Sequence, residues 1–564
     1  MKARFIFIIF ALCFLFARAE EQTKRPIVIF TIGDSTMADK TTEKSYPGRG
    51  WAQMLHCFLT DDVVVENHAA DGRSSLSFIQ EGRWNKVLEK LKKGDYVLIQ
   101  FGHNDEKPAK ELHTIPGTTF DENLERFVRE TRAKGATPIL MNSIVRRNFQ
   151  PGNATQHQGS YEIEGKILVD THGPYLFSPQ VVAKKMNAPF VNMNKLTHDW
   201  VMKAGVEPSK KFFMWIPKGT CVFFPNGNID NTHLSIEGAK EVAQIAIEAV
   251  AEVAPELKPY IRYRNSCVYI ADFKGDKTCA ISYTFDDGLQ EHFSLLYPHL
   301  EKLGFKSTFW VCGKIIEYKN AQLGKPRMTW EQLKEMSNSG HEISNHSWSH
   351  PVLTKLSEEE IKKQVSLCDS IIEKKIGKRP VTFCYPGNLC NDKVVAIASK
   401  NRVATRLKQY AIGEEVSKTT ADKLQTWVDN LLISKDWGVT MSHGITKGYD
   451  CFRDNKILWQ HFDWVKKHEK DIWVATFKQI GAYVKERNNT VLNVRKEGSY
   501  YRVVPVLKLD STLFSEPLTM VVKQEGNANV LVKQAGKQLP VEYTDGKIMF
   551  EFNPYEGEIV IENK

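Results

Sequence analysis

The chain has 564 residues, of which 42% are hydrophobic, 25% charged and 11% aromatic. This composition is that of an ordinary globular protein and excludes a disordered or fibrous chain. The length exceeds the roughly 100 to 200 residues of one domain, so we expect two or three domains. The net charge of +9 arises from 76 basic and 67 acidic residues that are interspersed. Because they form no basic stripe with interleaved aromatic residues, nucleic acid is not an expected partner.

The N-terminus has the three parts of a secretory signal peptide. A basic start is followed by an apolar run over residues 5–16 and by the small-x-small site Ala17-Arg18-Ala19. The apolar run is shorter than the roughly 20 residues that a membrane-spanning helix needs. We therefore expect cleavage of residues 1–19, a secreted or periplasmic mature chain, and no transmembrane segment after cleavage.

The spacing of the cysteines argues against a zinc ribbon. One of the 10 cysteines lies in the signal peptide, and the others show no CxxC pairing. We expect these cysteines to be buried free thiols, although an exported chain also permits a disulfide.

Two stretches of the chain alternate short apolar runs with amphipathic segments, which is typical of parallel sheets flanked by helices. The first stretch predicts a three-layer α/β domain, with strands over residues 27–32, 63–67, 96–101, 138–142 and 189–191 and helices over 84–91, 120–134 and 236–253. The second stretch is also α/β, with strands predicted over 279–285 and 307–312 and helices over 290–303 and 358–375.

After residue 483 the pattern changes to short alternating segments separated by turn signals such as Asp545-Gly546. A small antiparallel β module is predicted there, with strands over 501–509, 518–523, 530–533, 541–543, 548–552 and 558–561. It has no clustered histidines, cysteines or paired acids, so we expect an accessory role in packing or glycan contact. The predicted order is a signal peptide over 1–19, a first domain over 26–255, a linker over 256–274, a second domain over 275–487 and the β module over 488–564.

A serine follows the first predicted strand. In Gly33-Asp34-Ser35-Thr36 the Ser35 hydroxyl lies in a glycine-assisted turn at the carboxyl edge of the sheet, where open parallel sheets bind ligands. A serine becomes a nucleophile when a histidine accepts its proton and a third group orients that histidine. Asp230 and His233, close together near the end of the domain, are the candidates for these roles. Gly72 and Asn104, in turns after two other strands, are candidate oxyanion donors alongside the Ser35 N–H.

These four segments, in this order, resemble the SGNH hydrolase family, and residues 67–74 and 78–84 resemble its rhamnogalacturonan acetylesterase branch. The resemblance covers about residues 27–255. It implies a three-layer α/β/α fold with Ser35 as the nucleophile and Asp230 and His233 completing the triad. Gly72 and Asn104 would complete the oxyanion hole, and no cofactor is expected. His68 and His103 stand beside these segments without a required role and are expected to be structural.

Two adjacent acids end a strand of the second domain. Asp286 and Asp287 precede Gly288, and their like charges call for a stabilising partner such as a metal ion. His346 and His350 are four residues apart and can share one ion with Asp287. Such an Asp/His/His set leaves positions open, as catalytic sites do, and its donors suit zinc, with iron, cobalt or nickel as alternatives.

The segments around these acids and histidines, together with Phe383-Cys384-Tyr385-Pro386-Gly387 and Ser442-His443-Gly444, resemble the polysaccharide deacetylase family over about residues 275–487. The resemblance implies a distorted (β/α) barrel with the site at the strand carboxyl ends. It makes Asp286 the base, Tyr385 a backbone oxyanion donor and His443 the acid, for which Asp436 is a possible partner. Asp287, His346 and His350 would ligate the divalent metal.

One departure from this family concerns an arginine. Many members have an arginine in the third motif that contacts the base, whereas this chain has Cys384 in that stretch. Arg379 lies nearby in the sequence but is not assigned that role.

Together with the signal peptide, the two resemblances imply a secreted carbohydrate esterase that removes acetyl groups from a plant cell-wall polysaccharide such as rhamnogalacturonan or another pectin. The expected partner is therefore an acetylated polysaccharide or oligosaccharide. Two alternatives remain open. The second domain could be an N-deacetylase of chitin-like or peptidoglycan glycans, or the chain could be a glycan-binding protein whose second domain is degenerate.

Overall fold

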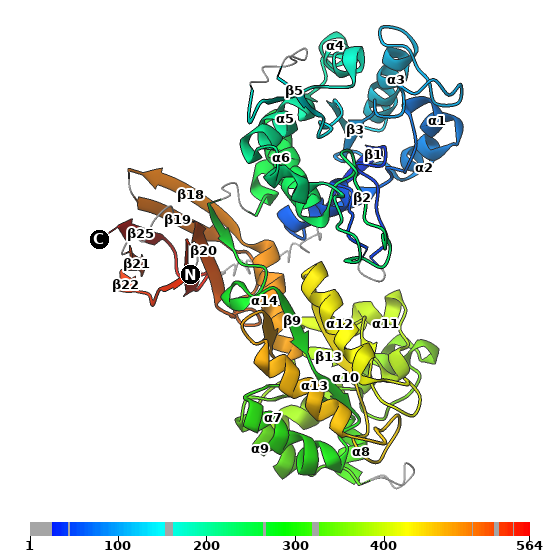
Figure 1. Cartoon of the computed structure of the whole chain (residues 1–564). Helices are drawn as coiled ribbons and strands as arrows, with labels where there is room; N and C mark the ends of the chain where they lie inside the picture. Colours follow the sequence, from blue (N-terminus) through cyan, green and yellow to red (C-terminus); the bar gives the residue numbers. More distant parts are fainter. Residues whose placement is uncertain are drawn as a thin grey trace, which may run out of the picture.

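The computed structural model describes residues 25–42, 46–152, 162–262, 267–318, 326–498, 500–523, 530–544 and 546–563. The predicted signal peptide lies outside these residues. Along the described chain, an α/β domain is followed by a second α/β domain and then by antiparallel strands (Figure 1). Among the described helices, none combines the length and the apolar character required to cross a membrane.

A five-stranded parallel sheet forms the centre of the first domain, in the order β2-β1-β3-β4-β7. Its strands are β1 (Ile27–Gly33), β2 (Val63–Asn67), β3 (Tyr96–Gln100), β4 (Thr137–Met141) and β7 (Phe190–Val191), and a separate hairpin joins β5 (Phe149–Pro151) to β6 (Lys166–Leu168). From β1 the chain goes first to the edge strand β2 and then to β3 on the other side. This reversal of direction at β1 and β3 creates the crevice in which open α/β sheets bind ligands.

Helices cover both faces of this sheet. Alternate side chains of a strand point to opposite faces. Accordingly, Ile29 and Leu98 belong to one buried cluster, whereas Phe30 and Val97 belong to another. The first cluster includes side chains of α5 (Met193–Ala204) and α6 (Ile236–Val253), and the second includes those of α1 (Ser75–Gln80), α2 (Arg83–Lys90), α3 (Thr119–Ala133) and α4 (Ser178–Met186). The predicted three-layer fold is therefore confirmed.

The second domain is built on a curled parallel sheet. Its strands pair in the orders β10-β11-β12-β13-β14 and β15-β16-β9-β17, and a parallel bridge between Phe285 and Ser442 connects the two groups. The strands are β9 (Cys279–Ser282), β10 (Thr284–Asp286), β11 (Thr308–Val311), β12 (Glu342–Asn345), β13 (Thr382–Cys384), β14 (Ala404–Arg406), β15 (Tyr410–Ala411), β16 (Trp437–Met441) and β17 (Ile472–Val474). The single strand predicted over 279–285 is interrupted at Tyr283, because β9 pairs with β16 and β17 whereas β10 pairs with β11.

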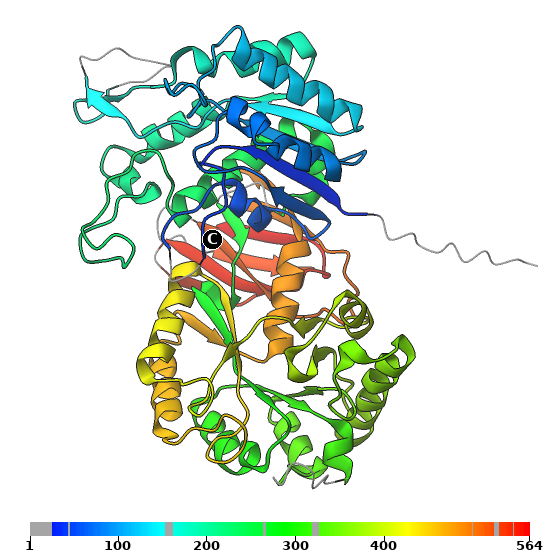
Figure 2. The same cartoon turned by 90° about the vertical axis from the view of Figure 1, so that its right-hand side faces the viewer.

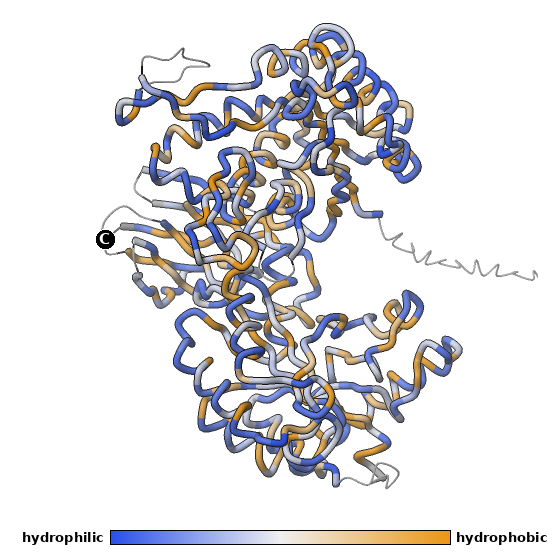
Figure 3. The backbone as a smooth tube through the Cα atoms, turned by 45° about the vertical axis from the view of Figure 1, so that its right-hand side comes forward, coloured by the Kyte–Doolittle hydropathy of each residue, from blue (hydrophilic) through white to orange (hydrophobic). Residues whose placement is uncertain are grey.

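Helices surround this curled sheet: α7 (Tyr297–Leu303), α8 (Gly313–Tyr318), α9 (Trp330–Asn338), α10 (Glu358–Ile376), α11 (Asp392–Ala398), α12 (Ala421–Ser434), α13 (Lys456–Lys467) and α14 (Phe477–Asn489). Orange and blue stretches alternate along the coiled parts of the backbone in Figure 3, as expected of helices that bury one face. Helix α10 illustrates the local signals: a Ser357–Glu360 capping box begins it, and Gly377 in the left-handed region follows its end.

The C-terminal strands form two antiparallel sheets, ordered β18-β19-β25-β21-β22 and β23-β24-β20-β8. Strand β8 (Val268–Ile270) comes from the segment predicted to be a linker, so that prediction is wrong for these residues. The other strands are β18 (Val491–Glu497), β19 (Tyr500–Val506), β20 (Leu518–Lys523), β21 (Val530–Gln534), β22 (Lys537–Gln538), β23 (Glu542–Thr544), β24 (Lys547–Phe552) and β25 (Ile559–Asn563). A three-residue strand carries too little alternation to be distinguished from a linker by its sequence.

Candidate active sites

The predicted nucleophile lies in a tight turn at the carboxyl end of β1. Ser35 is half-buried, and the preceding Asp34 holds the turn by accepting hydrogen bonds from the Thr36 N–H and hydroxyl at 2.9 and 2.8 Å. A side chain at Gly33 would clash with the Gln100 carbonyl and with Met37, at 2.5 and 2.4 Å from its Cβ. Glycine at this position therefore lets β1 approach β3 and places the Ser35 hydroxyl at the sheet edge.

The structure brings the predicted histidine and aspartate to this serine. The distance from His233 Nε2 to Ser35 Oγ is 2.9 Å, and that from His233 Nδ1 to Asp230 Oδ2 is 2.7 Å. The other carboxylate oxygen of Asp230 accepts the backbone N–H groups of Thr232 and His233, at 2.8 and 2.9 Å. The carboxylate is thus fixed by its own loop.

These contacts determine whether the Asp230 carboxyl is ionised and which nitrogen of His233 carries the proton. Burial acts to raise the pKa of Asp230, but the hydrogen bonds from His233 and Thr232 outweigh it and lower the pKa below its usual value. An ionised carboxylate only accepts hydrogen bonds, so His233 Nδ1 carries the proton. His233 Nε2 is then free to accept the proton of the Ser35 hydroxyl, as a general base must.

The predicted oxyanion donors lie on two turns that are joined to each other. Gly72 adopts a φ of 75°, in the left-handed region that favours glycine. Asn104 is 3% exposed, and its amide donates to the carbonyl of Arg73 at 3.0 Å. One N–H of that amide remains for another acceptor. Asp105 accepts the backbone N–H groups of Ser75 and Gly102, at 3.0 and 3.1 Å, and so clamps the same two turns together.

The two histidines expected to be structural, His68 and His103, have different hydrogen-bond partners. His68 pairs with Glu66 at 3.3 Å. His103 belongs to a buried chain in which its Nδ1 lies 2.9 Å from His172 Nε2, and His172 Nδ1 lies 2.9 Å from Asp170. Among the described residues, the His103 Nε2 atom has no hydrogen-bond partner.

In the second domain, the predicted metal ligands gather at the carboxyl ends of β10 and β12. Asp287 follows β10, and His346 and His350 follow β12. Asp287, Ser347 and His350 have φ values of 74°, 67° and 57°. Such conformations are uncommon outside glycine and concentrate at functional sites.

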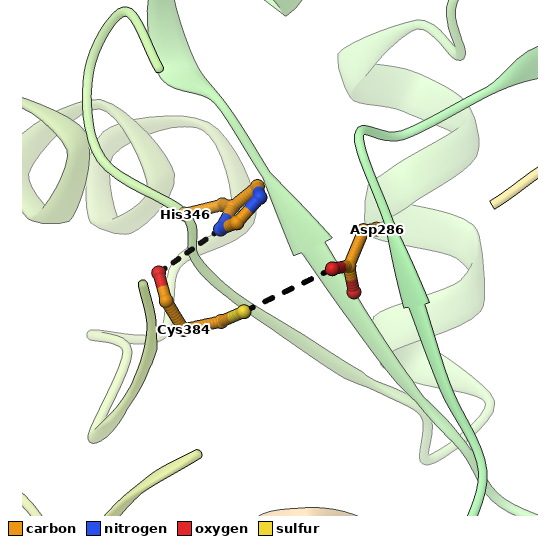
Figure 4. Close-up of side chains that lie close together, drawn as sticks. All are labelled: Asp286, His346 and Cys384. Carbon is orange, nitrogen blue, oxygen red and sulfur yellow. Dashed lines mark hydrogen bonds between the residues drawn. The ribbon is translucent and has the colours of Figure 1, made fainter. Parts of the chain in front are cut away.

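The donor set fits one divalent cation. His346 Nε2 and His350 Nε2 each lie 3.9 Å from Asp287 Oδ1. Ligand atoms of a tetrahedral zinc, at 2.0–2.2 Å from the ion, are about 3.4 Å apart, so small inward movements would complete the site. Burial lowers the pKa of His346 to about 4, which leaves a neutral imidazole able to ligate. The backbone carbonyl of Cys384 accepts a hydrogen bond from His346 Nδ1, the other ring nitrogen, at 2.9 Å and so orients the ring (Figure 4).

An arginine that the sequence analysis did not identify contacts the predicted base. Arg406 forms two hydrogen bonds to the Asp286 carboxylate, at 2.7 and 2.5 Å, and both side chains are buried. Although burial acts to raise the pKa of Asp286, the Arg406 guanidinium holds it well below its usual range. The carboxylate is therefore ionised and able to accept a proton.

Strand pairing explains how Arg406 reaches this site. It is the register partner of Cys384 on the neighbouring strand, β14 beside β13. Cys384 Sγ lies 3.9 Å from the same Asp286 carboxylate (Figure 4). The guanidinium thus arrives from the strand beside the cysteine. Arg379, by contrast, is exposed and pairs with Glu373 at 3.0 Å.

The remaining predicted residues of the second site lie on two further strand ends. His443 follows β16, and its Nε2 lies 4.0 Å from Asp286 Oδ2. Asp436 precedes β16, at the opposite end of a five-residue strand. At about 3.3 Å per residue it is too far away to be the partner of His443, so that prediction is wrong. Tyr385 follows β13 and is buried, and its hydroxyl donates to Thr405 Oγ1 at 2.9 Å.

The nine cysteines of the described chain form no disulfide with one another. Cys279, Cys312, Cys368, Cys384 and Cys451 are buried, as expected, whereas Cys267 and Cys390 are exposed.

Comparison with family models assigns the two halves separately. Residues 31–168 match the GDSL-like Lipase/Acylhydrolase family, and residues 274–405 match the Polysaccharide deacetylase family. The matched segments contain Ser35, Gly72 and Asn104 in the first case, and the adjacent aspartates and both histidines of the predicted metal site in the second.

Individual relatives agree with this division. The rhamnogalacturonan acetylesterase RhgT of Bacillus subtilis is 35% identical over 242 residues, which are 43% of this chain and 97% of that protein. A rhamnogalacturonan acetylesterase of Emericella nidulans is 43% identical over 244 residues, 39% of this chain and 84% of that protein. Chitin deacetylase 1 of Cryptococcus neoformans is 36% identical over 117 residues, 21% of this chain but only 23% of that protein. The chain therefore belongs to the GDSL-like lipase/acylhydrolase family through its first domain, which is homologous to rhamnogalacturonan acetylesterases, and carries a polysaccharide deacetylase domain after it.

Proposed function

We propose that the mature chain is an exported carbohydrate esterase that removes O-acetyl groups from plant cell-wall polysaccharide, rhamnogalacturonan or another pectin, at two sites. The observation that carries the proposal is the hydrogen-bonded chain from Ser35 Oγ through His233 to Asp230, with distances of 2.9 and 2.7 Å. The names of the acetylesterase relatives, which cover nearly the whole first domain, support the substrate class.

At the first site, His233 Nε2 would accept the Ser35 proton while Oγ attacks the acetyl carbonyl carbon. Asp230 would hold the imidazole in the required tautomer and stabilise the imidazolium that forms. The N–H groups of Ser35 and Gly72 and the free amide N–H of Asn104 would stabilise the oxyanion. His233 would then protonate the departing sugar oxygen. In the second half of the reaction, His233 would accept a proton from the water that attacks the acetyl-serine and would then return it to Ser35 Oγ as acetate leaves.

At the second site, Asp287, His346 and His350 would hold a divalent cation, with zinc as the first choice for this donor set. A bound cation would supply Lewis acidity toward the acetyl carbonyl. Asp286 would accept a proton from the attacking water, and Arg406 would keep that carboxylate ionised until it does. His443 would donate a proton to the leaving oxygen, and Tyr385 would contribute its backbone N–H to the oxyanion.

A second candidate concerns the bond cleaved by the deacetylase domain. The comparisons include chitin deacetylase 1 and a Bacillus subtilis peptidoglycan-N-acetylmuramic acid deacetylase, PdaC, which is 36% identical over 115 residues. Both names describe amide-bound acetyl groups. Chelator-sensitive acetate release from N-acetylglucosamine oligomers would favour this N-deacetylase candidate over O-deacetylation.

Substitution of the first triad tests the esterase site. We expect Ser35→Ala to abolish chelator-resistant acetate release from acetylated rhamnogalacturonan, because the nucleophile is lost. Asp230→Asn should lower it by about 10⁴-fold, as the corresponding change does in a well-studied serine protease. Asp199→Asn, which changes an exposed carboxylate paired with Lys195, is the control. Full chelator-resistant activity in Ser35→Ala would contradict the assignment.

Metal removal tests the second site independently. We expect EDTA to remove only part of the acetate release and added Zn²⁺ to restore it. Elemental analysis should find about one cation per chain, and His350→Ala should lose it because one of three protein ligands is missing. His113→Ala, at an exposed histidine of the first domain, should retain the cation. Binding of polysaccharide without any acetate release, with or without Zn²⁺, would instead support a glycan-binding protein.

The Asp286–Arg406 pair provides a third test. Arg406→Met leaves a buried carboxylate without its counter-charge, which typically costs about 3–5 kcal/mol of folding free energy. We expect a lower Tm and at least a tenfold loss of chelator-sensitive acetate release, partly restored in Arg406→Lys. Arg379→Met removes an exposed guanidinium that pairs with Glu373 and lies 3.6 Å from Asp369, a carboxylate that keeps its pairing with Arg402, so it should change stability by no more than about 1 kcal/mol. Equal behaviour of Arg406→Met and Arg379→Met would show that the buried pair has no role.

A further inference from the structure

An apolar loop stands beside the first site. The chain between η4 (Pro208–Phe212) and α6 makes an excursion over residues 217–227, and its tip is the run Cys221-Val222-Phe223-Phe224. Val222 is 79% exposed and Phe223 is 37% exposed, and Ile229, just after the excursion, is 73% exposed. Single exposed apolar residues are common, but here three of them lie within eight residues of one loop, and grouped exposed apolar side chains can mark a binding site.

Hydrogen bonds hold this loop in shape. Its base is closed by two backbone hydrogen bonds between Ile216 and Asn228, both 2.9 Å. Within it, Gly219 N–H donates to the Pro225 carbonyl at 3.1 Å, and Gly227 N–H donates to the Phe224 carbonyl at 2.9 Å. The exposed apolar side chains are therefore presented by an ordered turn, which loses little conformational entropy on binding.

The loop is attached directly to the segment that carries the catalytic pair. Met214 N–H donates to the His233 carbonyl at 3.0 Å, and Phe213 and Leu234 form an antiparallel bridge. Asp230 follows the loop base after Ile229, so the apolar surface begins next to the carboxylate that orients His233. Figure 2 shows this green loop projecting from the first domain.

Tyr46 extends the apolar surface from a different part of the chain. Its ring packs edge-on against Phe223, with centroids 5.2 Å apart at 86°, and lies 6.1 Å from the Phe224 ring. The Tyr46 segment runs beside the segment after His233, since Gly48 bridges to Ser235. Burial and the nearby carboxylates of Asp71 and Asp230 raise the pKa of Tyr46.

We propose that Tyr46 and Phe223, together with Val222 and Ile229, form a platform on which a sugar ring of the polysaccharide lies while a neighbouring acetylated sugar occupies the Ser35 site. Sugar rings have apolar C–H faces that match aromatic side chains, and the Tyr46 hydroxyl can bind a sugar hydroxyl at the platform edge. This inference rests on the proposed ester hydrolysis at Ser35 and adds to it a preference for polymers over small acetyl esters.

The test compares a polymer with a small ester in the full-length protein. We expect Phe223→Ala to lower the ratio of kcat/KM for acetylated rhamnogalacturonan to that for p-nitrophenyl acetate by five- to tenfold, mainly through KM for the polymer. Phe223→Trp retains an aromatic face and should keep the ratio within twofold of the unmodified protein. Val181→Ser, at an exposed apolar residue of α4, is the matched control and should leave both activities unchanged.

Two outcomes would overturn the platform. The first is an unchanged ratio in Phe223→Ala, whether both activities are retained or fall equally, and the second is a change of oligomeric state that marks the loop as a contact between copies of the chain. Failure of the proposed ester hydrolysis at Ser35 would look different, because chelator-resistant p-nitrophenyl acetate hydrolysis by the unmodified protein would then be absent or would survive in Ser35→Ala.

Discussion

The hydrogen bond between the Ser35 hydroxyl and His233 connects residues that are 198 positions apart in the chain. Two local features fix the segments that carry these atoms. On one side, Gly33 lets β1 approach β3 closely enough to fix the nucleophile turn. On the other, Ser235 caps α6 by accepting the Gly238 N–H at 3.0 Å, so the helix begins at Ile236, three residues after His233. The segment that carries His233 is therefore anchored to the start of α6.

The second domain is governed by a different constraint, the repulsion between two adjacent carboxylates. Its structure gives each of them a different partner. Asp286 is buried and paired with Arg406, whereas Asp287 adopts a positive φ and its Oδ1 lies 3.9 Å from both His346 Nε2 and His350 Nε2. Because the two acids have different counter-charges, they can take different roles, one as a base and the other as a ligand.

The parts of the fold that were predicted correctly have strong local signals. Helix α6 spans the predicted residues 236–253, because Ser235 is a good cap and the apolar period continues to its end. Strand β2 likewise matches residues 63–67. Strand β18 was not predicted, because it lies at a sheet edge and among its residues only Leu492 is buried, so its alternation is weak.

The two errors at the second site, a missed arginine and a wrong partner for His443, concern residues whose positions depend on the strands. Local spacing in the sequence does not show how strands pair or how far apart their ends lie. Arg406 lies 120 residues after Asp286 and reaches it only because β14 pairs with β13 in a register that places Arg406 beside Cys384. A motif search for an arginine near Cys384 in the sequence could not find it. Asp436 was an attractive partner of His443 in the sequence, but the intervening residues are extended, and an extended strand separates its two ends.

Pairing between strands also places the domain boundaries differently from the predicted linear order. Strand β8 precedes the deacetylase domain but pairs with β20, which follows it, and Val268 and Ile270 belong to the same buried cluster as Met520 and Val522. The deacetylase domain is therefore inserted into the β module, between β8 and β18. Helix α14, which ends the inserted domain, contacts both neighbours: the Tyr483 hydroxyl donates to the Ala271 carbonyl at 3.0 Å, and Lys485 pairs with Asp61 of the first domain at 2.6 Å. A boundary at residue 487 would cut within α14 and separate β8 from β20, so the β module and the deacetylase domain are better treated as one folding unit.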